Sequence, residues 1–218
     1  MAKKGLLVLV IAALVAGGAF AQIQMSAGAG MAVNFGRLGG MSISDPKTSS
    51  MFNHVGFGGF LFFDATYAEL SLGFGGGGVN QIDKSDGKTD KEKWGSVTTM
   101  DIGLLGKYPI SLGSVSVAPL LGFAYNIVVG MKDKDGKKIE DGVNKSDFNT
   151  FRLQAGVGTD ISINENLYVR IQGLGHYRFA SKFAKDLATL SKLGGYGDKV
   201  KANGGFGGTV TAAVGYKF

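Results

Sequence analysis

Apolar and polar residues alternate along most of the chain after residue 22, and this period of two is typical of β-strands. In the final segment, Val210, Val214, Tyr216 and Phe218 fall on one face, while small or polar residues fall on the other. The same alternation occurs in eight segments, which are 23–35, 53–63, 68–75, 99–108, 115–127, 151–161, 167–178 and 206–218. The pattern therefore predicts an all-β protein with eight strands.

The connections between these segments alternate between long and short. The long ones are residues 37–52, 76–95, 130–147 and 180–203, and short turns lie between them. This rhythm is expected of a barrel in which both chain ends and the short turns share one side. We therefore predict an eight-stranded antiparallel up-and-down β-barrel with four long loops on the opposite side.

The two faces of the predicted strands favour a transmembrane barrel. The apolar faces carry the large residues, whereas the opposite faces carry Gly, Ser, Thr, Gln and charged residues. A soluble barrel of the lipocalin type would point its large residues inward around a ligand. A closed barrel also satisfies every backbone group inside lipid. The second strand has aromatics on both faces, including Phe60 and Phe62, and we expect a bulge at Pro119 in the fifth strand.

Charged residues fall on the faces that would point into the barrel. They include Glu69, Asp101, Lys107, Arg152, Arg170 and Arg178. Charges inside a lipid-embedded barrel should be paired, because unpaired ones are costly. From their distances to the short turns, we predict that Glu69, Lys107 and Arg170 form a network that closes the periplasmic half of the lumen. Asp101 should pair with Arg152 or Arg178 higher up.

The chain's last strand carries a recognisable motif. Val210, Val214, Tyr216 and Phe218 resemble the C-terminal assembly signal of bacterial outer-membrane barrels, although Ala213 stands where many members have Gly. The whole chain after the first segment resembles the small eight-stranded outer-membrane barrels of the opacity, OmpX and OmpW kind. The resemblance implies contact with outer-membrane lipid and with the barrel-assembly machinery. It also implies a surface-binding or adhesion protein, an envelope stabiliser, or a narrow channel for small, often hydrophobic molecules.

The first residues predict a cleaved secretory signal over residues 1–21. Lys3 and Lys4 precede an apolar run at 6–16, which is too short to span a bilayer. A small-x-small cleavage site follows and consists of Ala19, Ala21 and, after the cut, Gln22. Residues 22–218 would then form one barrel domain in the outer membrane.

Composition narrows the remaining chemistry. The absence of Cys from the sequence excludes disulfides, thiolate metal sites and a lipid-modified N-terminal Cys. The formal charge of +6 invites a nucleic-acid partner, but Lys alternates with Asp in the long connections, so we predict none. Within residues 180–203, an amphipathic helix through Phe183, Leu187 and Leu190 would either contact anionic surfaces or fold over the barrel mouth.

No motif predicts a cofactor or a metal. Residues 73–78 fit GxGxxG, but a polar connection follows instead of a helix, and residues 131–142 lack two ligands of a calcium loop. His54 and His176 are expected to form hydrogen bonds inside the barrel. A lipid-modifying barrel enzyme would need a His and Ser pair near the rim, and Ser181 is the nearest serine after His176.

The sequence favours a non-enzymatic integral barrel that presents its four long connections for surface interaction, adhesion or envelope stabilisation. A narrow porin-like conduit for small, including hydrophobic, molecules is the alternative. A lipid-modifying enzyme is a more distant third.

Overall fold

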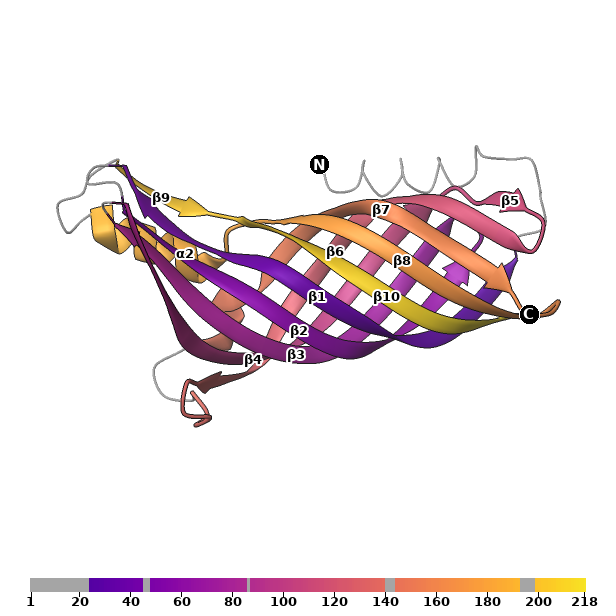
Figure 1. Cartoon of the computed structure of the whole chain (residues 1–218), viewed down its shortest axis with the longest axis horizontal. Coiled ribbons are helices and arrows are strands. Elements are labelled where there is room, and N and C mark those ends of the chain that lie inside the picture. The colour runs from indigo at the N-terminus through magenta and orange to yellow at the C-terminus, as the bar shows by residue number, and fades with distance from the viewer. Residues whose placement is uncertain (1–23, 45–47, 86, 140–143, 193–198) are drawn as a thin grey trace, which may run out of the picture.

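The computed structural model describes residues 24–44, 48–85, 87–139, 144–192 and 199–218. Eight long strands form a closed antiparallel barrel (Figure 1), and they are β1 (Met25–Ile43), β2 (Thr48–Ala65), β3 (Ala68–Ser85), β4 (Lys88–Lys107), β6 (Val115–Asp133), β7 (Thr150–Ser162), β8 (Leu167–Arg178) and β10 (Gly205–Lys217). Each pairs with its neighbour along the chain, and β10 closes the ring by pairing with β1. The predicted fold class is confirmed. The predicted signal segment lies outside the described residues.

Four shorter elements lie at the ends of the barrel, and they are β5 (Ile110–Leu112), η1 (Lys145–Phe148), α2 (Lys182–Ser191) and β9 (Val200–Asn203). β5 pairs with β6, and β9 pairs with the outer part of β1. We call the end with the connections 66–67, 108–114 and 163–166 the turn end, and the opposite end the rim end. The C-terminus lies at the turn end (Figure 1). No helix among the described residues is long and apolar enough to cross a membrane.

Strand register decides which side chains face outward. Val33 of β1 lies opposite Val210 of β10 on one side and opposite Phe57 of β2 on the other, so the three form one outward row. Phe57 is 71% exposed, whereas Phe62 of the same strand is 3% exposed. The facing of β2, which the sequence leaves ambiguous, is therefore settled, and Phe62 points into the lumen.

Large apolar side chains cover the outside of the barrel and end in aromatic residues on both sides. At the turn end, Tyr67 and Tyr108 stack with their ring centroids 6.4 Å apart. Toward the rim end, the ring of Tyr177 packs 4.9 Å from that of Phe206. An outward apolar band between two aromatic girdles is typical of a barrel that spans a bilayer with its strands. The predicted polarity of the barrel is therefore confirmed.

The four connections that the sequence predicted as long loops are mostly folded, so their predicted boundaries are wrong. β1 and β2 remain paired out to Ile43 and Thr48, and β3 and β4 remain paired out to Ser85 and Lys88. Residues 130–147 contain the end of β6 and η1, and residues 180–203 contain α2 and β9. Where both faces of a strand are polar, alternation no longer marks it, although the backbone hydrogen bonds continue.

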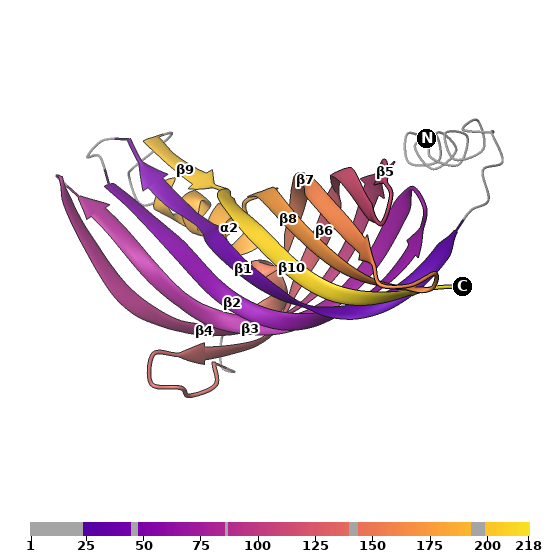
Figure 2. The same ribbon diagram turned by 45° about the vertical axis from the view of Figure 1, so that its right-hand side comes forward.

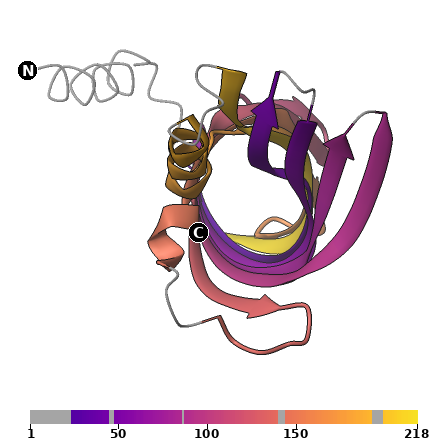
Figure 3. The ribbon, with the colours of Figure 1, turned by 90° about the vertical axis from the view of Figure 1, so that its left-hand side faces the viewer.

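The rim end is uneven in height (Figure 2). β1, β2, β3, β4 and β6 have 18–20 residues, whereas β7, β8 and β10 have 12 or 13. About 9–11 residues suffice for a tilted strand to cross a membrane. The taller strands therefore project beyond the bilayer. At the rim, η1 lies between β6 and β7 in the chain, and α2 and β9 lie between β8 and β10 (Figure 3).

The predicted amphipathic helix between β8 and β10 exists as α2. The ring of Phe183 stacks on that of Phe148 in η1, with centroids 4.4 Å apart. Lys182 donates to Asp147 at 3.1 Å, and this hydrogen bond raises the pKa of Lys182. Leu190 is exposed, so it does not belong to the packed face that the sequence proposed. Of the two alternatives, these contacts favour a segment that is folded against the barrel mouth.

The bulge predicted at Pro119 is wrong. The register between β6 and β7 runs through the pair Pro119 and Val157 without a shift. The amide of Tyr108 donates a hydrogen bond to the Pro119 carbonyl at 3.4 Å. The Pro119 backbone therefore faces Tyr108, the first residue after the end of β4. A missing N–H donor is tolerated there, because Pro119 faces the break between β4 and β5.

Cysteine labelling should establish the orientation of the barrel, because the native sequence contains no Cys. If the rim end faces outward, Lys88→Cys at the tip of the β3–β4 hairpin should react with a membrane-impermeant maleimide on intact cells. Glu165→Cys, in the turn between β7 and β8, should react only after the cells are broken. The reverse labelling pattern would overturn the assignment of the rim end to the outside.

Candidate functional site in the barrel lumen

A buried ion network fills the lumen near the turn end. Arg170 of β8 is its centre, and its guanidinium contacts three carboxylates. The Nη1 atom lies 2.6 Å from Glu69 Oε2, and the Nη2 atom lies 2.6 Å from Asp64 Oδ2 and 2.7 Å from Asp160 Oδ2. Lys107 of β4 forms a further ion pair with Asp64. We call these five residues the lumen network.

Within the lumen network, Arg170, Glu69 and Asp64 are almost completely removed from water, whereas the Asp160 side chain is 25% exposed. The side chains of Arg170, Glu69 and Asp64 are each 2–3% exposed. Gln172 donates a hydrogen bond to Glu69 Oε2 at 2.9 Å, so this carboxylate has two partners. Buried charges of this kind are stable only when each is paired and hydrogen-bonded. The network therefore connects opposite walls of the barrel across its axis.

Aromatic rings pack beside the ions of the lumen network. The Arg170 guanidinium lies 4.7 Å from the centroid of Phe62 and 5.2 Å from that of Tyr168. The Tyr168 hydroxyl forms a 2.8 Å hydrogen bond with Ser26 Oγ. Gly215 makes this packing feasible, because a Cβ atom there would lie 2.3 Å from the Tyr168 ring. Ions and rings therefore pack together in this layer of the lumen.

One ion pair of the observed network differs from the predicted one. The structure brings Glu69 and Arg170 into direct contact, whereas Lys107 pairs with Asp64 rather than with Glu69. The sequence interpretation treated Asp64 as part of a turn. A signal for its true position was present, because Phe60, Phe62 and Asp64 follow one another at every second position on the inward face of β2.

A second polar layer lies higher in the lumen. Arg152 Nη2 lies 3.1 Å from Asp101 Oδ1, and Asn126 donates to the same oxygen at 3.0 Å. Arg178 forms no ion pair among the described residues, and its Nη1 atom reaches only the Thr150 hydroxyl, at 3.4 Å. The sequence left Arg152 and Arg178 as alternative partners of Asp101, and in the structure Asp101 pairs with Arg152.

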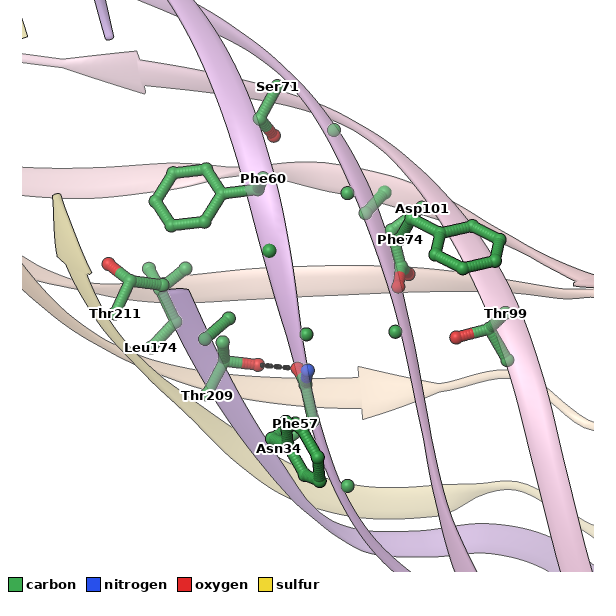
Figure 4. A pocket seen from close by; sticks show the side chains of 18 of the residues that line it. Asn34, Phe57, Phe60, Ser71, Phe74, Thr99, Asp101, Leu174, Thr209 and Thr211 are labelled. Carbon is green, nitrogen blue, oxygen red and sulfur yellow. Dashed lines mark hydrogen bonds between the residues drawn. The ribbon is translucent and has the colours of Figure 1, made fainter. Parts of the chain in front are cut away.

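Two cavities flank this second polar layer. The lower one has a volume of ≈ 80 Å³, and its lining combines apolar side chains such as Phe60 and Leu174 with polar ones, among them the hydrogen-bonded pair Thr209 and Asn34 (Figure 4). The upper one has a volume of ≈ 360 Å³ and lies at the rim end. We call it the rim cavity. The two cavities and the lumen network therefore follow one another along the lumen from the rim end to the turn end.

The two histidines lie inside the barrel, as their positions in the strands predict. Both are buried, but His54 Nε2 and His176 Nδ1 have no hydrogen-bond partner, so the expected hydrogen bonds do not form at these atoms. Ser181 does not pair with His176. The Ser181 hydroxyl instead accepts a hydrogen bond from the Ala184 amide and caps the N-terminus of α2. No group of three or more possible metal ligands occurs among the described residues.

Comparisons with solved structures find other outer-membrane barrels. OprG from Pseudomonas aeruginosa is 12% identical, with a TM-score of 0.47, and the match covers 90% of this chain and 96% of OprG. The outer-membrane protease OmpT from Escherichia coli is 8% identical, with a TM-score of 0.44 and coverage of 89% and 97%. Ail, the attachment invasion locus protein of Yersinia pestis, is 14% identical, with a TM-score of 0.39 and coverage of 90% and 99%. No protein-family model and no curated protein matches the sequence.

The chain's own architecture assigns its location. An even number of strands, a closed ring, an apolar outer band and a polar interior together define the bacterial outer-membrane class of β-barrel. The protein is therefore an integral barrel of the bacterial outer membrane.

Proposed function

We propose that this protein is a non-enzymatic barrel whose lumen is closed to ions and which acts at the cell surface through its rim end. The observation that carries the proposal is the lumen network, in which Arg170 of β8 contacts Asp160 on the neighbouring β7 and reaches across the barrel to carboxylates of β2 and β3. An eight-stranded barrel is just wide enough for its side chains to fill. A lumen filled by paired charges is a plug rather than a path.

The projecting strands support a role in surface interaction. β3 and β4 remain paired for several residues beyond the apolar band, and their outer parts carry charged residues of both signs, which are Asp83, Lys84, Lys88, Asp90, Lys91, Glu92 and Lys93. Paired strands form a more rigid platform than loops of the same length, so less entropy is lost when a partner binds. In our proposal, the outer part of the β3–β4 hairpin, rather than long loops, provides the surface that interacts with a partner.

A narrow conduit remains the second candidate, because one feature favours it. Glycines of β2 and β3 lie opposite each other beside the lower cavity, in the pairs Gly56 with Gly77 and Gly58 with Gly75. The barrel wall has no side chains at these points. A conduit that avoids the lumen network would have to leave the barrel sideways through this thin wall.

Shortening the β3–β4 hairpin should separate the two functions. Gln81 and Glu92 lie opposite each other in the register, so an Asn-Gly turn can replace residues 82–91 and leave the membrane part unchanged. Bacteria that display the full chain should adhere to host-cell matrix more than vector controls, and the shortened variant should lose this gain while it still inserts. Adherence equal to the vector control, combined with uptake of small solutes by protein-containing vesicles, would favour the conduit instead.

A further inference from the structure

The rim cavity combines apolar walls with a charged floor. Its walls include Phe52, Val79, Trp94, Val97, Val128 and Met131. The Phe52 and Trp94 rings meet edge to face, with centroids 5.7 Å apart. The floor carries Asp101, Arg152 and Arg178, and the Phe148 and Phe183 rings lie at the η1 and α2 side. A volume of ≈ 360 Å³ lies within the range of small-molecule sites, about 300–1,000 Å³.

The floor of the rim cavity holds more positive than negative charge. Arg152 and Arg178 lie directly opposite each other on β7 and β8, an arrangement in which like charges repel. Asp101 pairs with Arg152, and no carboxylate among the described residues lies within ion-pair distance of Arg178. In contrast, the lumen network surrounds Arg170 with three carboxylates. The floor is therefore short of one negative charge.

The arginines of the floor also have unused hydrogen-bond donors. The Nε atoms of Arg152 and Arg178 are buried and have no partner, and Arg178 is only 5% exposed. The Nε2 atom of His54, which also lines the cavity, has no partner either. Buried charged donors without acceptors are costly, and native proteins seldom leave them so. An anion bound in the cavity would supply the negative charge that the floor lacks.

We propose that the rim cavity binds an amphipathic anion, which is a single alkyl chain with a carboxylate or phosphate head. The head would contact Arg178 and Arg152, and the chain would lie against Trp94, Phe52 and Met131. The proposal rests on the closed lumen of the proposed function, because a ligand above the lumen network is held rather than passed on. Guanidinium groups suit either head, since both heads accept two parallel hydrogen bonds.

The single tryptophan of the chain provides the test, because Trp94 lines the rim cavity. The full protein in lipid nanodiscs would be titrated with a bromine-labelled undecanoate, and quenching of Trp94 fluorescence would be followed. We expect saturable quenching that dodecanoate or dodecyl phosphate reverses and that dodecanol and dodecyltrimethylammonium do not. The stronger of the two anions identifies the head group. Equal competition by dodecanol would overturn the anion site.

Variants separate the head contact from the tail contact. Arg178→Met should weaken binding at least about tenfold, the loss that 1.4 kcal/mol represents, and Lys137→Met on the exposed β6 turn should leave binding unchanged. Val97→Phe should reduce binding by filling the apolar part while the floor keeps its charges, and it keeps the test valid if Arg178→Met does not fold. Wild-type affinity in folded Arg178→Met would refute the proposal. Ion conductance by the wild type would refute the closed lumen instead, and it leaves the fluorescence result unaffected.

Discussion

Replacing Arg170 with methionine should destabilise the barrel by about 3–5 kcal/mol, the usual cost of removing one partner from a buried ion pair. Three carboxylates share this guanidinium, and after its loss only Lys107 remains beside them within the lumen network. Methionine is long and flexible, so it fills much of the vacated space and isolates the loss of charge. Urea unfolding of the protein refolded into lipid vesicles would measure the change in free energy.

Two further variants make this result specific. Lys185→Met removes an exposed cation from α2 and should leave the unfolding curve unchanged. Arg170→Lys keeps a positive charge but cannot reach all three carboxylates at once, so its stability should be intermediate. Vesicles that contain Arg170→Met should also lose a potassium gradient faster than wild-type vesicles. Wild-type stability in Arg170→Met would mean that the lumen network does not hold the barrel together.

Replacing Phe218 with aspartate should remove most of the protein from the outer membrane while secretion into the periplasm continues. We propose this because Val214, Tyr216 and Phe218 resemble the signal that the barrel-assembly machinery recognises. In the structure all three side chains point outward and are exposed, and the Phe218 amide donates to the Met25 carbonyl, which ties the terminus to β1. Heat-modifiable protein in membrane extracts would be quantified.

Phe206→Asp is the matched control for this experiment. Phe206 lies on the outward side of the same strand at the rim end, and its exposure of 71% is close to that of Phe218, at 70%. A charge near the membrane interface costs only about 0–1 kcal/mol, so the control should still insert. An equal loss of insertion in both variants would show that Phe218 acts as a general interface anchor and not as an assembly signal.

Alternation predicted the barrel because lipid and lumen impose different polarity on the two faces of each strand. The inward depth of Glu69 and Arg170 followed from the same alternation, since each lies a few residues from a short turn. The alternation also predicts the direction of Asp64, which lies beside a turn, because Asp64 follows Phe60 and Phe62 at every second position on the inward face of β2. The inward position of the Asp64 carboxylate could therefore have been predicted from the sequence.

Other features could not be predicted because their causes lie outside the pattern of one strand. The outer halves of β3 and β4 pair across charged and glycine-rich residues, and only the backbone hydrogen bonds between them reveal two strands. The unpaired state of Arg178 depends on the register that sets it opposite Arg152 and on the position of Asp101, which lies on β4, three strands away from β8. The rim cavity likewise depends on how α2 folds back.

Planar-bilayer recording of the purified wild-type protein tests the closed lumen most directly. With the lumen network intact, the membrane should show no regular conductance steps in potassium chloride, and steps should appear with Arg170→Met. Regular, uniform steps from the wild-type protein would contradict a closed lumen, because ions would then have a path past Arg170, Glu69 and Asp64.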